Sequence, residues 1–191
     1  MTLPDDVVRV LDGWSAPDAD QEALRVRFLS LMNERPGAVS REHAGMHITA
    51  STLVVDADAQ RVLLCLHGRV RRWLQVGGHL EPEDPTLAAA ALREATEETG
   101  IHGLRLDPTP IHLDIHRVNC RSGPSDHYDV RFAAIAPPDA VEQVSDESDA
   151  LGWFAPGALP SPMGHATEVL IAPALVAATR LRLERGENSL R

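Results

Sequence analysis

The first part of the chain carries apolar residues at helical spacing. Val7 and Leu11 begin a short stripe. A longer stripe has apolar side chains at positions i, i+4, i+7 and i+8, and its members are Leu24, Phe28, Leu31 and Met32. This spacing predicts an amphipathic helix that begins near Asp18 or Asp20 and ends before Pro36. We therefore expect residues 1–44 to form a helical N-terminal extension.

At His47 the pattern changes, and polar and apolar residues begin to alternate. Such alternation, together with short apolar runs between turn residues, predicts β-strands. We expect strands at residues 47–55, 62–66, 73–76, 111–118, 128–135 and 151–154. Two substantial helices are interspersed with these strands, so the order predicts a layered α/β domain with a mixed sheet over residues 45–191.

The strongest helix signal lies between Asp84 and Gly100. Asp84 is a favourable N-cap residue, Pro85 suits the first helical position, and strong helix formers follow at residues 87–92. Gly100 suits the left-handed backbone conformation that ends many helices. A final amphipathic helix is expected near residues 167–183.

Composition and charge narrow the class of protein. Hydrophobic residues make up 43% and charged residues 24%, and no apolar run approaches the length of a membrane span. The first residues lack the basic and apolar segments of a signal peptide, so we expect a cytoplasmic location and no membrane partner. The formal net charge is −10, and every basic residue is an arginine. Such an acidic chain is a poor partner for nucleic acid.

Three carboxylates are concentrated in the predicted long helix. Glu94, Glu97 and Glu98 stand at i, i+3 and i+4, so they share one helical face near the C-terminal end, where the helix dipole disfavours negative charge. A solvated acidic face is the ordinary explanation of such a cluster. A hard cation such as Mg²⁺ or Mn²⁺ is the functional one, because it prefers oxygen ligands and bridges carboxylates to phosphates.

The segment from Gly78 to Ile101 closely resembles the Nudix box, G-x5-E-x7-R-E-U-x-E-E-x-G-U, in which U is aliphatic. Its second half, Arg93-Glu94-Ala95-Thr96-Glu97-Glu98-Thr99-Gly100-Ile101, agrees at every fixed position. The first half departs from the pattern, because Arg93 lies 15 positions after Gly78 where the family has 14. Asp84 stands where the loop glutamate is expected, which leaves the role of that glutamate open and assigns Asp84 an N-cap role.

The resemblance implies a Nudix-like α/β/α sandwich and a hydrolase. Its substrate would be a nucleoside diphosphate derivative or a related compound, in which water attacks a phosphorus of the pyrophosphate linkage with the help of Mg²⁺ or Mn²⁺. By resemblance, the metal ligands are Glu94, Glu97, Glu98 and the carbonyl of Gly78. The implied catalytic residues are Glu97, Glu98 and Arg93, with Arg93 orienting the helix carboxylates.

Three predicted strands carry unusual polar faces. Alternate residues of a strand share one side, and the polar sides are formed by His47, Thr49 and Ser51; by His112, Asp114 and His116; and by His127, Asp129 and Arg131. Such faces are either solvated or part of a substrate cleft. In the second case, Arg131 would bind phosphate, His127 would contact substrate, and a histidine would take part in proton transfer. His79 lies beside the predicted metal loop, so it is the histidine we place nearest the site.

The general base has several candidates. A carboxylate that binds Mg²⁺ tightly is a poor proton acceptor, because the metal stabilises its ionised form. We favour a glutamate of the long helix, Glu97 or Glu98, and keep Glu142 and Glu147 of the following acidic loop as alternatives.

Two rival functions share the expected fold. One is a noncatalytic sensor that binds a nucleotide. The other is an isopentenyl-diphosphate isomerase, which needs a cysteine and glutamate pair, although Cys65 and Cys120 lie in no evident matching motif. The particular small-molecule diphosphate is not determined by the sequence, and neither is the oligomeric state, with which a homodimer is compatible.

Overall fold

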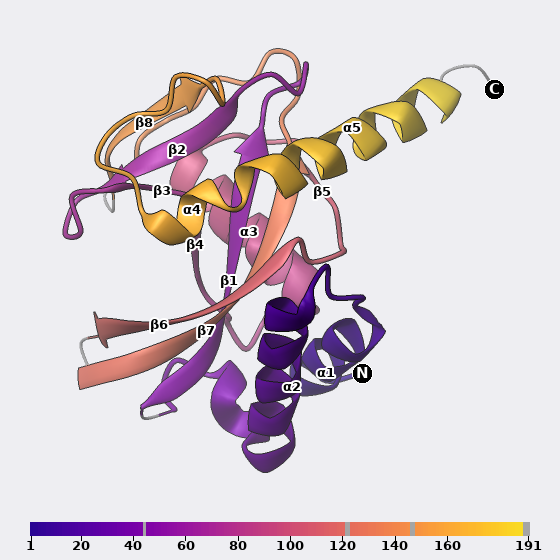
Figure 1. Ribbon diagram of the computed structural model, residues 1–191, viewed down its shortest axis with the longest axis vertical. Helices are drawn as coiled ribbons and strands as arrows, with labels where there is room; N and C mark the ends of the chain where they lie inside the picture. Colours follow the sequence, from indigo (N-terminus) through magenta and orange to yellow (C-terminus); the bar gives the residue numbers. More distant parts are fainter. Residues whose placement is uncertain (44, 121–122, 146–147, 189–191) are drawn as a thin grey trace.

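In the described part of the chain, eight strands form one mixed sheet with helices packed against both of its faces (Figure 1). The computed structural model describes residues 1–43, 45–120, 123–145 and 148–188. The helices are α1 (Leu3–Gly13), α2 (Ala19–Glu34), a 3-10 helix η1 (Pro36–Val39), α3 (Leu87–Thr99), α4 (His165–Glu168) and α5 (Ile171–Asn188). The strands are β1 (Met46–Val55), β2 (Val62–His67), β3 (Trp73–Leu74), β4 (Val76–His79), β5 (Arg105–Leu106), β6 (His112–Cys120), β7 (Gly123–Ile135) and β8 (Ser148–Phe154).

The centre of the sheet is the long parallel pair of β1 and β7. Their register runs from Met46 opposite Asp126 to Val55 opposite Ile135. On its other side, β1 pairs antiparallel with β4 through residues 49–52 and with β2 through residues 54–55. Strand β7 also pairs with β5 and β6, and β2 pairs with β3 and β8. The short strand β4 therefore lies beside the middle of the sheet.

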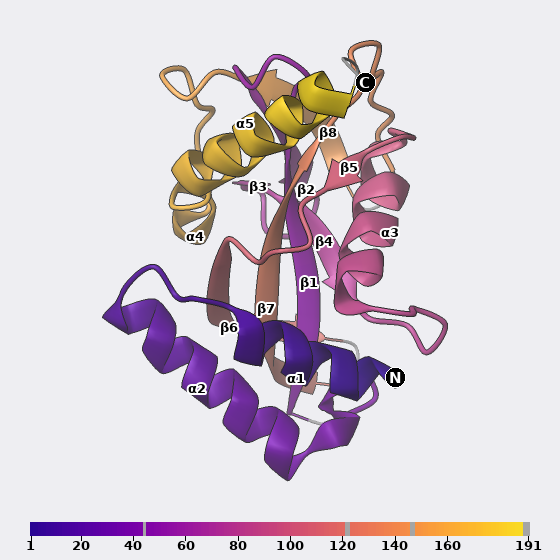
Figure 2. The same cartoon turned by 90° about the vertical axis from the view of Figure 1, so that its right-hand side faces the viewer.

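The two faces of the sheet are covered by different helices, as Figure 2 shows. Helix α3 lies on one face, and α4 and α5 lie on the other. Alternation along β1 explains this, because Ala50 packs in a cluster with Ala91 of α3, whereas Leu53 packs in a cluster with Ala174 of α5. The predicted α/β/α sandwich with a mixed sheet is confirmed.

The N-terminal helices share a hydrophobic core with the sheet. Val7 of α1 and Phe28 of α2 are fully buried in the same cluster as Leu87 of α3. The buried carboxylate of Asp6 accepts a hydrogen bond from the Leu87 backbone N–H at 2.8 Å. Helix α1 therefore helps to fix the start of α3. The division at residue 44 remains a prediction from the sequence.

Several element boundaries differ from the predicted ones. Thr86, not Asp84, is the N-cap of α3, and its hydroxyl accepts from the Ala89 N–H. The predicted strand at 73–76 is two short strands, which pair with different neighbours. The last long helix begins at Ile171 because Pro173 lacks an N–H and its ring clashes with a helical carbonyl four residues earlier. Strand β5 has only two residues, too few to produce a periodic pattern.

Candidate active site

Helix α3 presents the predicted acidic cluster at its C-terminal end. Ala91 and Ala95 are fully buried against the sheet, so the remaining side of the last turns carries the glutamates. The Glu94 side chain is 16% exposed and that of Glu97 is 59% exposed. A deeper and a more accessible carboxylate thus occupy the same turn.

Strand β4 approaches this cluster through a glycine. A Cβ atom on Gly78 would lie 2.6 Å from Oε2 of Glu94, which is too close for a side chain. Glycine at this position therefore lets the backbone of β4 and a helix carboxylate lie side by side. The structure places the predicted ligands Gly78 and Glu94 next to each other.

The guanidinium of Arg93 donates hydrogen bonds to two helix carboxylates and to a backbone carbonyl of β4. Nη1 donates to Oε1 of Glu94 at 3.0 Å and to Oε2 of Glu97 at 3.1 Å. Nη2 donates to the backbone carbonyl of His79 at 2.9 Å. These bonds connect the helix to the end of β4. An orienting role for Arg93 requires such bonds, because they fix the directions of the Glu94 and Glu97 carboxylates.

Asp84 accepts hydrogen bonds from another edge of the same guanidinium. Nε and Nη2 of Arg93 donate to its two carboxylate oxygens at 3.0 and 2.9 Å, and its Oδ2 also accepts from the Glu81 N–H at 2.8 Å. Although burial raises the pKa of Asp84, its hydrogen bonds to Arg93 and Glu81 lower that pKa below the usual value. The residue at the irregular position of the loop is therefore a clamp for Arg93, a role that sequence spacing did not reveal.

The donor set suits a hard divalent cation. Glu94, Glu97, Glu98 and the Gly78 carbonyl offer only oxygen atoms, the ligand type that Mg²⁺ prefers. Among the described residues, the ligand atoms of the three glutamates do not form one tight group, although Nη1 of Arg93 contacts both Glu94 and Glu97. Mg²⁺ commonly keeps several waters and uses one or two carboxylates, so this arrangement is compatible with it.

The acidic loop after β7 lies beside the same end of α3. The Gln143 N–H donates to the Thr99 carbonyl at 2.7 Å, which anchors the loop to the last turn of the helix. Glu142 accepts a hydrogen bond from Trp153 Nε1 at 2.9 Å. This candidate base is therefore near the helix terminus but engaged by Trp153. Glu147 lies outside the described residues.

The polar faces of β1, β6 and β7 meet on the sheet face opposite α3. Thr49 and Ser51 donate to the buried carboxylate of Asp129 at 3.2 and 2.8 Å. Arg131 donates to Asp129, to Asp114 and to the Ala166 carbonyl, and it is only 2% exposed. Each of its three guanidinium nitrogens donates to a protein acceptor, and the phosphate contact of Arg131 stays a prediction. Much of this face is a buried polar network and not a solvated surface.

His79 and His127 lie on this opposite face together with His47. Burial, and then the neighbouring histidines, lower the pKa of His79 to about 4 and that of His127 to about 3. Burial also lowers the pKa of His47. All three rings are therefore neutral near pH 7. The sequence had placed His79 and His127 near substrate, but it did not show that they adjoin His47.

Comparisons with known proteins agree with this fold. The NUDIX domain family model matches residues 45–173. The MutT NUDIX hydrolase from Burkholderia pseudomallei is 26% identical, with a TM-score of 0.53 over 67% of this chain and 97% of that one. A search of curated proteins found no match. The chain belongs to the NUDIX domain family, whose enzymes are pyrophosphohydrolases that act on acid anhydrides.

Two further solved structures share the fold. The NUDIX domain of NrtR from Shewanella oneidensis, solved with ADP-ribose, is 20% identical with a TM-score of 0.53, over 83% of this chain and 97% of that one. A UDP-X diphosphatase is 18% identical with a TM-score of 0.50, over 94% of this chain and 96% of that one. The last match extends into the N-terminal helices, because it leaves only 6% of this chain uncovered.

The contact of Asp84 with Arg93 predicts a pH-dependent contribution to stability. Because the pKa of Asp84 is lowered on folding, its stabilising effect is fully present above the unfolded value of 3.8 and is lost as the pH falls through the lower folded value. We expect Asp84→Asn to lower the free energy of unfolding by about 1–3 kcal/mol near pH 7, with a smaller deficit below pH 3.8. Urea unfolding at a series of pH values measures this.

The matched control for that experiment is Asp58→Asn, at an exposed turn. Its effect on unfolding should be small at every pH. A deficit of Asp84→Asn that stays constant, or grows, as the solution becomes acidic would show that the carboxylate is not held ionised by Arg93.

Proposed function

We propose that this chain is a Mg²⁺-dependent hydrolase that cleaves a pyrophosphate linkage in a nucleoside diphosphate derivative or a related compound. The observation that carries the proposal is the contact of Arg93 with Glu94, Glu97 and the β4 backbone, beside Gly78. It assembles oxygen donors at a site where backbone and carboxylate come close. Attack of water on a phosphorus is the chemistry that such a site supports best.

Mg²⁺, with Mn²⁺ as the alternative, would be held by Glu94, Glu97, Glu98 and the Gly78 carbonyl. When bound, the ion would neutralise diphosphate charge and activate water. Arg93 keeps the Glu94 and Glu97 carboxylates directed, since its planar fork is itself held by Asp84. Arg93 is thus a positioning residue in this proposal, and a helix glutamate takes the proton of the attacking water.

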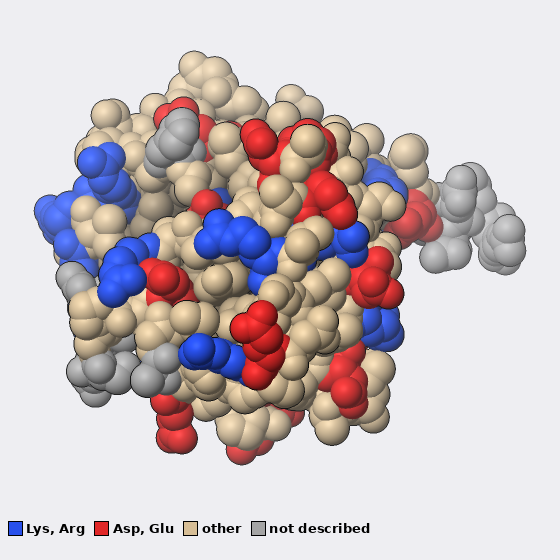
Figure 3. Space-filling model, turned by 60° about the horizontal axis from the view of Figure 1, so that its bottom comes forward, with Lys and Arg blue, Asp and Glu red and all other residues tan. Residues whose placement is uncertain are grey.

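The metal also explains how an acidic protein attracts an anionic substrate. With a net charge of −10, the whole molecule repels diphosphates at long range. On the face shown in Figure 3, arginine side chains lie among acidic ones. Local attraction at the metal site must then overcome the overall repulsion.

The location and the partners follow from the sequence only. We propose a cytoplasmic enzyme acting on a small-molecule diphosphate. In the described part of the chain, no helix combines the length and the apolar character that a bilayer crossing needs.

The two rival functions, an isomerase and a noncatalytic sensor, make different demands on the protein. Cys65 is buried, and burial is the main cause that raises the pKa of its thiol to about 12, so it is a poor acid or base for an isomerase. A noncatalytic sensor would bind nucleotides without turnover. The NrtR NUDIX domain was solved with ADP-ribose, which makes ADP-ribose a suitable first compound for a comparison of binding with hydrolysis.

The proposal is tested by a phosphate-release screen with Mg²⁺ or Mn²⁺. Nucleotide sugars, ADP-ribose, dinucleoside polyphosphates, nucleoside triphosphates and nonnucleotide diphosphates are incubated with enzyme, and phosphatase is added where the products need it. We expect metal-dependent turnover of at least one class, and a loss of at least about 100-fold in kcat for Glu97→Gln or Glu98→Gln. Full activity in EDTA, or binding of a nucleotide without turnover, would contradict the proposal.

The general base is identified by the pH dependence of kcat. We expect the base to be whichever of Glu97 and Glu98 lies outside the tightest metal coordination. Its Gln variant should lose the acidic limb of the profile while it retains metal affinity, because a base must be deprotonated to work. Glu142→Gln is the matched loop variant, and it should keep that limb because Trp153 engages the Glu142 carboxylate. Loss of the limb in Glu142→Gln or Glu147→Gln alone would transfer the role to the loop.

A further inference from the structure

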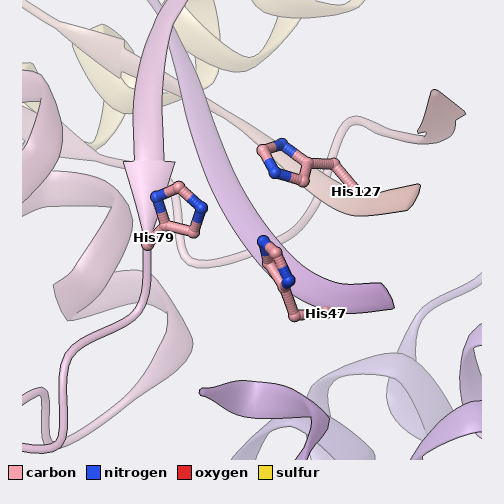
Figure 4. A group of neighbouring side chains, drawn as sticks. All are labelled: His47, His79 and His127. Carbon is pink, nitrogen blue, oxygen red and sulfur yellow. The ribbon is translucent and has the colours of Figure 1, made fainter. Parts of the chain in front are cut away.

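Three histidines from three strands converge on the sheet face opposite α3. They are His47 on β1, His79 on β4 and His127 on β7, and Figure 4 shows their rings grouped around a common space. One ring nitrogen of each lies within 4.8 Å of the others. Among the described residues, this is the one group of three histidine, cysteine or acidic side chains with ligand atoms so close together.

The sheet register brings these side chains together. His47 lies directly opposite His127 in the parallel pair of β1 and β7. His79 lies opposite Thr49, which is two residues from His47 on the same side of β1. The ring centroids are 4.7–5.1 Å apart. The strand pairing therefore fixes the Cα positions of the three histidines, and only rotation about the side-chain bonds can change the distances between their ring nitrogens.

The ordinary explanation is a packed group of core histidines, but His47 does not fit it. This residue is 1% exposed, and its Nδ1 lies 3.2 Å from the Ser125 hydroxyl. Its Nε2 is buried and has no hydrogen-bond partner in the described part of the chain. Leaving such a nitrogen unpaired costs about 1–3 kcal/mol. A bound ion would use its lone pair, and the Ser125 contact would orient the ring as an outer partner does in metal sites.

The chemistry of the donors indicates the kind of ion. Three neutral imidazoles suit Zn²⁺ and related transition metals, whereas Mg²⁺ prefers oxygen. A neutral imidazole nitrogen is the form that ligates a metal. Nitrogens around a tetrahedral Zn²⁺ at about 2.0–2.1 Å are about 3.3 Å apart, so small ring rotations complete the site.

This group is distinct from the acidic cluster. Adjacent residues of a strand point to opposite faces, and Gly78 faces Glu94 of α3. His79 therefore faces away from the acidic cluster, across the sheet. We propose that His47, His79 and His127 form a second metal site, which takes one Zn²⁺ ion and is separate from the Mg²⁺ site on α3.

The test uses the full-length, tag-free protein after treatment with EDTA and removal of the chelator. Co²⁺ serves as the spectroscopic probe, and bound Zn²⁺ is counted by elemental analysis. The titrations are made with the wild type and with a Glu94→Gln/Glu97→Gln/Glu98→Gln variant, which lacks the acidic ligands. We expect the triple Gln variant to bind one equivalent of Zn²⁺ and the wild type at least one, and both to give the visible Co²⁺ absorption of a nitrogen-ligated, low-coordinate site.

His79→Gln and His127→Gln each remove one ligand, and we expect them to weaken Zn²⁺ binding by at least about 100-fold. His102→Gln, at an exposed histidine after α3, is the matched control and should bind Zn²⁺ normally. Thermal unfolding shows whether each variant is folded. It also supplies a second readout, because Zn²⁺ should raise the Tm of the control but not of the ligand variants.

The proposal is overturned if His79→Gln and His127→Gln bind Zn²⁺ as the wild type does. It is equally overturned if the triple Gln variant loses the ion, or if the wild type binds none. Hydrolytic activity is not the readout, so the outcome is independent of the function proposed above. A triple Gln variant that loses turnover but keeps Zn²⁺ would separate the two sites. Direct contact of His79 or His127 with substrate would instead change KM without changing Zn²⁺ affinity.

Discussion

The site depends on one positively charged side chain, the guanidinium of Arg93, which is surrounded by hydrogen-bond acceptors. The guanidinium of Arg93 binds Asp84 in the loop, the His79 carbonyl at the end of β4, and Glu94 and Glu97 on its own helix. Without it, the clustered carboxylates would repel one another near the negative end of the helix dipole. A single planar fork thus compensates the charge of the cluster and holds strand, loop and helix together.

Strand β4 gives the molecule two chemically different faces within two residues. Gly78 lies against a carboxylate of α3, where oxygen donors gather, and His79 lies on the other face, among imidazoles. Burial has different consequences on the two sides. It leaves the hydrogen-bonded Asp84 ionised, because the contacts with Arg93 and Glu81 more than offset the desolvation. It keeps the histidines neutral, because desolvation is the largest influence on the pKa of each ring.

Local patterns predicted most of the fold and the acidic part of the site. Strand alternation and helical spacing depend on near neighbours, so the sequence alone was enough to locate β1, α2 and α3 and to put Glu94, Glu97 and Glu98 on one helical face. Contacts between distant residues could not be read in this way. The clamp of Asp84 on Arg93 depends on the path of an irregular loop, and the meeting of His47 with His127 depends on strand register. The buried pairing of Arg131 with Asp114 depends on the register of β6 against β7.

The most direct test of this account is the kinetics of Arg93→Lys with an identified diphosphate substrate. Lysine keeps the positive charge, but it cannot hold Asp84 and the helix carboxylates with one planar fork. The account predicts that kcat falls by at least about 10-fold while KM changes little, because the positioning of the carboxylates is lost and no substrate contact is removed. A near-normal kcat with a raised KM would contradict it, because Arg93 would then bind substrate instead of organising the site.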